Sequence, residues 1–276
     1  MNYQRTIKHP IELSGVGLHT GNKVKVILKP VNANTGIIFI RTDLPSCPKI
    51  KAHISNVLDV SYAITLGCKK FKIHTVEHFL GAFYALGIDN IIIEINNNEL
   101  PIMDGSAIDL VKMLSKNNIQ KLNVPKKFLK LKVAQYVQQN DRYLLAVPSD
   151  ELKISYTVDY KNKLIGTQYI DININDDTFI KDISSARTFG WMDEIKKQRK
   201  LGLIKGGSFE TALVFGKSKV LNKNGLRFSD EPVRHKVLDI LGAIALLGSP
   251  IKCHIIAVKS GHSLDIELVK LLSKLL

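Results

Sequence analysis

The chain has 276 residues, is 45% hydrophobic, and carries 39 Lys and Arg against 25 Asp and Glu, for a formal net charge of +14. A chain of this size can bury a large core and is expected to form two domains of roughly 100–150 residues. Its composition excludes intrinsic disorder. No apolar leader opens the sequence, and no run approaches the ~18 apolar residues of a membrane helix. With three scattered cysteines and no C-x-x-C pair, we expect a cytoplasmic protein.

The first half is predicted to alternate short strands with helices. We expect a hairpin turn at 15–21, because its G-x-G-x-x-x-G spacing has no βαβ context and does not match a phosphate loop. Thr75 is the expected N-cap of a helix that has Glu77 in its first turn and ends at Gly87. The other expected elements are strands at 23–28, 36–41, 71–73 and 91–95, and a helix over 107–114.

The second half is predicted to repeat this plan. Pro125 and two lysines mark a boundary within 122–127, which divides the chain into domains 1–124 and 125–276. Strands are expected at 129–137, 143–147, 153–160 and 254–258, with a helix beginning near Ser229 and Asp230. The predicted class is α+β: two similar domains, each a mostly antiparallel sheet with helices on one face, and a site between them. An apolar, Gly-containing insertion at 189–209 has no counterpart in the first half and is a candidate specificity segment.

Two segments of the chain resemble each other at a constant offset. Residues 74–87 recur as 235–248, so that His74 matches His235 and His78 matches Asp239, both 161 positions apart. Such self-similarity indicates an internal duplication. A site built from equivalent residues of two halves is expected where the halves meet.

His235 and Asp239 stand at i and i+4 and would share one face of a helix, where they can bind a single metal ion. His78, the duplicate of Asp239, is the candidate third ligand. Three N and O ligands with a fourth position left for water are typical of catalytic zinc, although the same set also accepts Fe²⁺. Each histidine taken alone is more often an ordinary core or surface residue.

A second interpretation uses His74, because residues 74–78 also read as H-x-x-E-H, the inverted zinc-protease motif. That motif requires one continuous helix, whereas the strand pattern before Thr75 places His74 outside it. We therefore favour His78 as the ligand. Glu77 could take a proton from a metal-activated water, and His262, expected on a loop after strand 254–258, could protonate a leaving nitrogen.

Along nearly its whole length the chain resembles the bacterial UDP-3-O-acyl-N-acetylglucosamine deacetylases of the LpxC family, which are zinc amidases of lipid A biosynthesis. Nine motifs carry the resemblance in order, and together they are highly specific. They lie at residues 15–21, 75–78, 86–90, 101–106, 185–190, 206–209, 225–228, 234–239 and 259–262. The resemblance implies hydrolysis of the N-acetyl group of UDP-3-O-acyl-N-acetylglucosamine with release of acetate, the committed step of that pathway.

The resemblance also assigns roles to individual residues. It implies His78, His235 and Asp239 as zinc ligands, Glu77 as general base, and His262 as the cation that stabilises the oxyanion and protonates the amine. Thr188 would hydrogen-bond the tetrahedral intermediate, Lys236 would lie near the site, and Lys259 would face the diphosphate. The 189–209 insertion would form the passage for the acyl chain, with candidate lining residues Phe189, Ile195, Ile204 and Phe209.

One position departs from the family pattern. An aspartate that commonly follows the Leu-Asp-x-x-Gly stretch and orients the catalytic histidine is replaced by Ala243. Loss of this carboxylate should lower the pKa of His262 and loosen its orientation, unless another group such as Asp265 replaces it.

The positive charge fits an anionic nucleotide sugar with a lipid tail, and it favours peripheral contact with the inner membrane. Biased use of Lys, Ile and Asn is an equally direct source of the charge. No stacking platform, helix-turn-helix, RNP or zinc-finger spacing is present, so we expect no nucleic-acid partner, and we expect a monomer. The remaining alternatives are a metalloprotease that uses His74 and His78, and a non-catalytic basic scaffold or nucleic-acid binder in which the histidines are packing residues.

Overall fold

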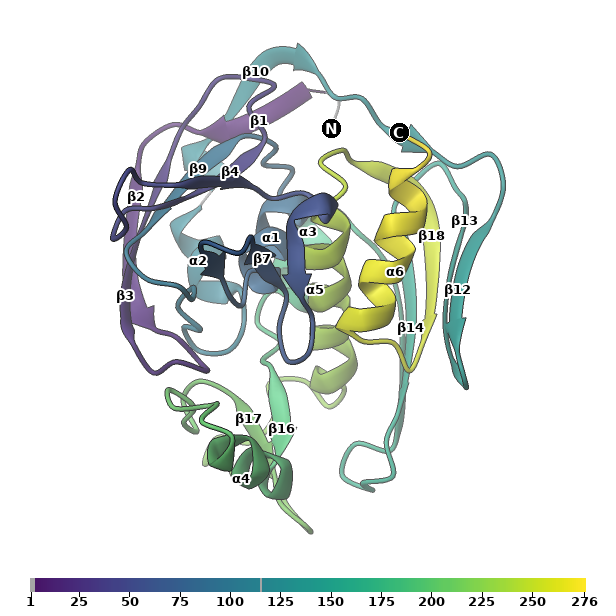
Figure 1. The fold of residues 1–276 in the computed structure, drawn as a ribbon. Coiled ribbons are helices and arrows are strands. Elements are labelled where there is room, and N and C mark those ends of the chain that lie inside the picture. The colour runs from purple at the N-terminus through teal and green to yellow at the C-terminus, as the bar shows by residue number, and fades with distance from the viewer. Residues whose placement is uncertain (1–2, 115) are drawn as a thin grey trace.

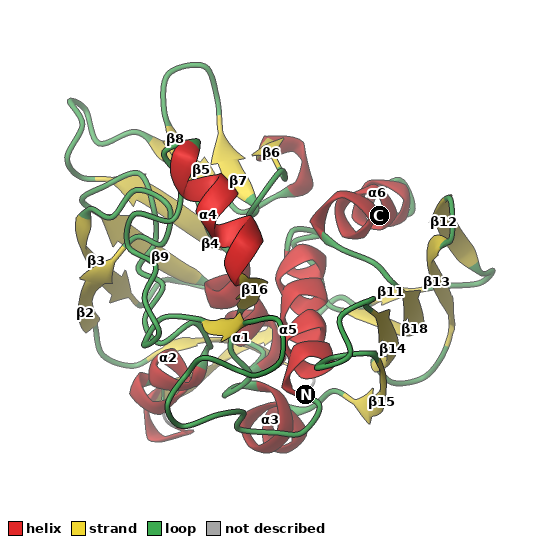
Figure 2. Ribbon diagram, turned by 90° about the horizontal axis from the view of Figure 1, so that it is seen from below, coloured by secondary structure: helices red, strands yellow, loops and turns green. Residues whose placement is uncertain are grey.

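The computed structural model describes residues 3–114 and 116–276. Two mixed β-sheets lie on either side of a central pair of helices, α1 (Glu77–Ala85) and α5 (Glu231–Ala245) (Figure 2). The predicted α+β class is confirmed. Figure 1 shows a smaller lobe, built around α4 (Met192–Lys200), that projects from this body.

The first sheet surrounds β9, a strand of nearly uninterrupted isoleucines. Its order is β2-β3-β9-β4-β5, and every pair is antiparallel except β4 with β9. Alternate residues of β3, among them Val24, Val26 and Leu28, are buried, as a strand with one face on a core requires. The strands are β2 (Ile11–Val16), β3 (Lys23–Lys29), β9 (Ile91–Ile95), β4 (Ile37–Arg41) and β5 (Lys49–Lys51).

The second sheet has the same strand order and the same sense of pairing. It runs β12-β13-β18-β14-β15, again antiparallel except for β14 with β18, and β11 adds a short parallel pairing to β18. This repeated topology supports the internal duplication inferred from the sequence. The strands are β11 (Leu129–Lys130), β12 (Gln135–Gln139), β13 (Arg142–Pro148), β14 (Lys153–Asp159), β15 (Thr167–Asn173) and β18 (Ile251–Val258).

Helices α1 and α5 cross in close contact at two glycines. A Cβ atom at Gly81 would lie 2.8 Å from the carbonyl oxygen of Leu238, and one at Gly242 would lie 2.3 Å from that of Glu77. The two contacts are equivalent under the 161-residue offset, because 81 corresponds to 242 and 77 to 238. A self-matching contact of this kind is what a twofold-related pair of repeats produces, and it brings the starts of both repeat motifs together.

The remaining elements pack around this centre. A strand pair, β1 with β10, joins the N-terminus to the end of the first half, and β6, β7 and β8 form a small antiparallel sheet. They are β1 (Tyr3–Ile7), β6 (Val57–Asp59), β7 (Thr65–Gly67), β8 (Lys72–Ile73), β10 (Ile119–Pro125), β16 (Phe189–Trp191), β17 (Leu213–Phe215), α2 (Ile108–Met113), α3 (Asp176–Thr178) and α6 (His262–Ser273), with single helical turns at Ile54–Asn56, Lys116–Asn118 and Phe179–Ile183. None of the helices in the described ranges combines the length and apolar character needed to cross a membrane.

Several local predictions are corrected. The N-cap of α1 is Val76, while Thr75 has a left-handed backbone (φ 59°) and its Oγ1 donates to Glu99 Oε1 (3.0 Å). The expected strand 129–137 is interrupted between β11 and β12. His262 is the first residue of α6 rather than part of a loop. Thr75 is drawn out of the cap position by its hydrogen bond to Glu99, which is distant in sequence. The helix α6 begins at His262 without a side-chain cap that the sequence could have indicated.

Candidate active site

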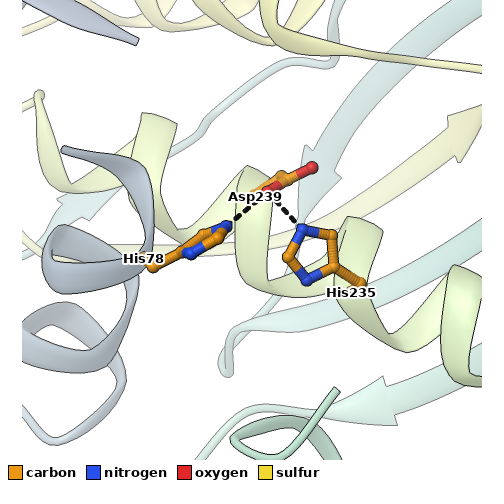
Figure 3. Close-up of side chains that lie close together, drawn as sticks. All are labelled: His78, His235 and Asp239. Atoms are coloured by element: carbon orange, nitrogen blue, oxygen red, sulfur yellow. Dashed lines mark ion pairs between the residues drawn. The ribbon is translucent and has the colours of Figure 1, made fainter. Parts of the chain in front are cut away.

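Three of the predicted ligands converge where α1 meets α5. His78 lies in the first turn of α1, and His235 and Asp239 are one turn apart on α5. Asp239 Oδ1 lies 3.8 Å from His78 Nε2 and 3.3 Å from His235 Nε2 (Figure 3). One ligand atom from each residue falls within 4.8 Å of the other two, and all three residues are buried. The structure therefore brings together the ligand set that the repeat predicted.

The hydrogen bonding of this group leaves lone pairs free for a cation. His235 Nδ1 donates to the carbonyl of Ala186 (3.0 Å), which fixes the tautomer and leaves Nε2 unprotonated. Asp239 Oδ2 accepts from Lys236 Nζ (2.8 Å), whereas Oδ1 is buried without a hydrogen-bond partner among the described residues. Buried polar atoms are normally satisfied. A metal ion bound by both imidazoles and Oδ1 fits this arrangement.

The protonation states also suit metal binding. Burial, followed by the neighbouring His235, lowers the pKa of His78 to about 3, and burial lowers the pKa of His235 as well. Burial, the largest single effect, would raise the pKa of Asp239, but the Lys236 ammonium and the neighbouring histidines together hold that pKa well below its usual range. Two neutral imidazoles and one carboxylate therefore face each other, which is the required state of such ligands.

Glu77 lies beside the ligands in the same cavity, whose volume is about 240 Å³. Its Oε2 accepts a hydrogen bond from the backbone N–H of Ile64 (2.9 Å), and the residue is only 3% exposed. Burial, and then the charge of Asp239, raises the pKa of Glu77 to about 8. A carboxyl group with such a pKa readily accepts and returns a proton near neutral pH.

His262 enters this cavity from the N-terminus of α6. Burial lowers its pKa to about 4, against the opposing effect of Asp239. Its Nδ1 has no hydrogen-bond partner within the described part of the chain. Asp265 does not hydrogen-bond His262: its Oδ1 accepts from Ser260 Oγ (2.6 Å), and Oδ2 is unpaired among the described residues. The described structure thus places no carboxylate on the imidazole of His262, and Ala243 is buried on α5.

Lys236 and Thr188 also line the cavity, as expected. Burial would lower the pKa of Lys236, but its pair with Asp239 raises it overall, so the ammonium is retained. The backbone N–H of Thr188 donates to Gly105 O (2.7 Å). This hydrogen bond connects the residue just before the 189–209 insertion with the first half of the chain. Both residues can contact a ligand bound near the imidazoles.

His74 lies outside the group. It precedes α1, and its Nδ1 is hydrogen-bonded to Thr65 Oγ1 (2.8 Å). It lines a neighbouring cavity rather than the one that contains His78. The H-x-x-E-H interpretation required His74 and His78 on one helix, and the structure does not provide that helix.

Glu99 is a residue that the sequence reasoning missed. It is 1% exposed, and it accepts hydrogen bonds from the backbone of His19 (2.8 Å) and Thr20 (2.8 Å) and from the hydroxyls of Thr20 (2.7 Å) and Thr75 (3.0 Å). These hydrogen bonds connect the turn after β2 with the residues just before α1. The same turn places His19 at the cavity. The sequence did contain one indication that Glu99 is buried, because this charged residue directly precedes the apolar residues 100–102.

The candidate passage residues are only partly gathered. Phe189 lines the cavity and packs edge-on against Tyr160, Trp191 and Phe215, with ring centroids 5.8–6.1 Å apart. Ile195 lies close to Gly190, and Ile204 close to Gly207. Phe209 is 48% exposed. None of the last three lines the cavity itself.

Lys259, the residue expected to face the diphosphate, lies just before α6. Its Nζ is held by Asp141 (3.0 Å) and Asp159 (2.8 Å), and its backbone is left-handed (φ 52°). These two carboxylates compete with an anionic ligand for the ammonium.

A buried His₂Asp group with one free carboxylate oxygen, next to a carboxyl group of raised pKa, a lysine and a further histidine, defines the class of metal-dependent hydrolases. Comparison with known proteins agrees. The model of the family described as UDP-3-O-acyl N-acetylglycosamine deacetylase, LpxC, matches residues 4–274. The chain belongs to this family, as its motifs predicted.

Curated relatives carry the same family name. The chain is 41% identical over 273 residues to the UDP-3-O-acyl-N-acetylglucosamine deacetylase of Teredinibacter turnerae, covering 98% of this chain and 90% of the relative. It is 42% identical over 270 residues to that of Thermodesulfovibrio yellowstonii, covering 98% and 91%. For the protein from Campylobacter fetus the values are 41% over 271 residues, 98% and 92%.

Proposed function

We propose that this chain removes the N-acetyl group of UDP-3-O-acyl-N-acetylglucosamine and releases acetate, as a step of lipid A biosynthesis, and that His78, His235 and Asp239 hold Zn²⁺ for this reaction. The observation that carries the proposal is Oδ1 of Asp239, which has no hydrogen-bond partner among the described residues, lies 3.8 Å and 3.3 Å from the two imidazoles, and belongs to the cavity that Glu77 also lines. Fe²⁺ suits the same ligands. Bound metal supplies polarisation of the acetyl carbonyl and a lowered pKa for water.

The residues around the ligands would carry the proton transfers. Glu77 takes the proton of the attacking water, and its Oε1 is suited to this because Oε2 already accepts the N–H of Ile64. Lys236 and the Thr188 hydroxyl stabilise the oxyanion that forms as hydroxide adds to the acetyl carbon. His262 in its cationic form adds to this stabilisation and donates its proton to the glucosamine nitrogen as the C–N bond breaks.

The larger parts of the substrate would occupy the second half of the chain. Phe189, Ile195, Ile204 and Phe209 would contact the acyl chain, and Lys259 would exchange one of its carboxylate partners for the diphosphate. We further propose domains 1–124 and 125–276, a monomer without a nucleic-acid partner, and action in the cytoplasm at the inner-membrane surface. The net charge of +14 supports attraction to an anionic substrate there.

Acetate release by the zinc-loaded protein tests this function, with Glu77→Ala and the isosteric Glu77→Gln alongside and zinc content measured for each. We expect both variants to keep zinc and to lose turnover by a factor of about 10²–10⁴, the usual contribution of a general base. Wild-type activity in Glu77→Gln would refute the assignment of the base. No turnover by the zinc-loaded wild type would refute the function.

Zinc retention distinguishes the two ligand sets. His74→Ala should keep one zinc per chain, because His74 is bonded to Thr65 and lies outside the ligand group. His235→Ala should lose it. The reverse pattern would favour a metalloprotease that uses His74 and His78.

A further inference from the structure

The projecting lobe presents a helix with two distinct faces. In α4, Met192, Ile195 and Gln198 are half-buried and recur every third residue, so they form the side that faces the lobe. The intervening positions are exposed and mostly charged. Figure 1 shows α4 in a lobe that projects from the body of the molecule, with β16 running between that body and α4.

The exposed face of α4 is cationic toward its C-terminal end. Lys196, Lys197 and Lys200 are exposed, and within residues 3–114 and 116–276 none of them forms an ion pair. The acidic residues Asp193 and Glu194 occupy the first turn instead, where they complement the helix dipole. The positive charge is therefore concentrated at the C-terminal end of α4.

An apolar side chain is exposed next to these cations. Leu201, the C-cap of α4, is 70% exposed, the largest value among the exposed large hydrophobic residues of the described chain. An exposed leucine beside lysines suits contact with an anionic lipid surface, where the lysines meet headgroups and the leucine enters the acyl boundary.

The same lobe adjoins the catalytic cavity. Phe189 leads into the lobe and lines that cavity. The loop after Leu201 contributes Gly202, Leu203 and Lys205 to a second cavity of about 360 Å³, which shares His19 and Tyr62 with the catalytic one. A surface that contacts the end of α4 therefore lies near these two neighbouring cavities.

We propose that the outer face of α4, defined by Lys196, Lys197, Lys200 and Leu201, docks the protein onto an anionic phospholipid bilayer. The proposal rests on the proposed function, since only a substrate with a lipid tail gives this contact its use. Charge complementarity selects the occupant: the face has three cations without an ion pair among the described residues, and the acidic Asp193 and Glu194 lie one turn nearer the N-terminus of α4. Docked in this way, the lobe presents its inner, apolar side to a tail that leaves the membrane.

Vesicle flotation of the zinc-loaded full chain tests the proposal. Vesicles of phosphatidylethanolamine with one quarter phosphatidylglycerol are compared with neutral phosphatidylcholine vesicles. Each lysine near an anionic surface strengthens binding by about fivefold, so the triple variant K196Q/K197Q/K200Q should bind about a hundredfold more weakly. Leu201→Ser should weaken binding by about tenfold. The matched control K127Q/K130Q/K132Q removes the same charge from exposed positions on another part of the chain and should weaken it much less.

Three outcomes would overturn the docking surface: no preference of the wild type for anionic vesicles, an equal loss in the control triple variant, or unchanged binding by the α4 variants. An α4-dependent interaction with an acidic protein but not with vesicles would also overturn it. Acetate release from a soluble short-chain substrate separates this result from the proposed function, because K196Q/K197Q/K200Q should keep wild-type turnover there. Failure of the wild type in that assay would refute the function and leave the flotation result standing.

Discussion

Replacing Gly242 by alanine tests whether the helix crossing sets the geometry of the metal site. The new Cβ would lie 2.3 Å from the carbonyl oxygen of Glu77 and 2.8 Å from its Cα. Ordinary contact begins near 3.4 Å, so α1 must move away from α5 by about 1 Å. His78 follows Glu77 directly and would move with it, whereas ligand distances tolerate only about 0.2 Å.

The expected effect is a loss of zinc affinity that exceeds the loss of stability. Alanine is a better helix former than glycine by about 1 kcal/mol, and overpacking costs typically 1–3 kcal/mol, so the free energy of unfolding of the metal-free protein should fall by about 0–2 kcal/mol. Zinc affinity should fall by at least about a hundredfold, since one ligand leaves its position. Gly81→Ala, with its nearest contact at 2.8 Å from Leu238, should give a smaller effect of the same sign.

Chelator competition measures the zinc dissociation constants, and urea unfolding measures the stabilities. Gly261→Ala is the matched control, because its backbone is extended (φ −171°) and a Cβ there meets no atom within 4 Å. It should keep wild-type zinc affinity. If folded Gly242→Ala bound zinc with wild-type affinity, the distance between α1 and α5 at Gly242 would not control the geometry of the metal site.

Two further predictions concern buried groups near α6. Ala243→Asp places a carboxylate one turn beyond Asp239 on α5 and should raise the pKa of His262, now about 4, with up to about a tenfold gain in kcat at neutral pH for each unit of pKa. An unchanged pH–rate profile in that variant would contradict the idea. For Asp265, burial raises the folded pKa to about 6 from 3.8, so the folded state binds the proton more tightly and stability should fall by about 3 kcal/mol as pH rises from about 4 to about 6. Asp265→Asn should remove this slope in urea unfolding measured at several pH values, and equal slopes in both proteins would refute it.

The failed local predictions have identifiable physical causes. Thr75 has the chemistry of an N-cap, but Glu99, 24 residues away, accepts its hydroxyl instead. The start of α6 is capped by Gly261 without a side-chain hydrogen bond, so no capping signal marked His262 as helical. Both outcomes depend on groups that are distant in sequence or have no side chain, and local patterns do not record them.

The sequence by itself predicted the candidate ligand set. The 161-residue offset and the i, i+4 spacing favoured His78, His235 and Asp239, because equivalent positions of two related repeats are expected to meet at a shared site. Only the tertiary structure decided that the ligand atoms converge, that His74 is turned away, and that no described carboxylate supports His262. The convergence of the ligand atoms depends on how closely α1 and α5 approach at Gly81 and Gly242, a distance set by packing between segments far apart in the chain.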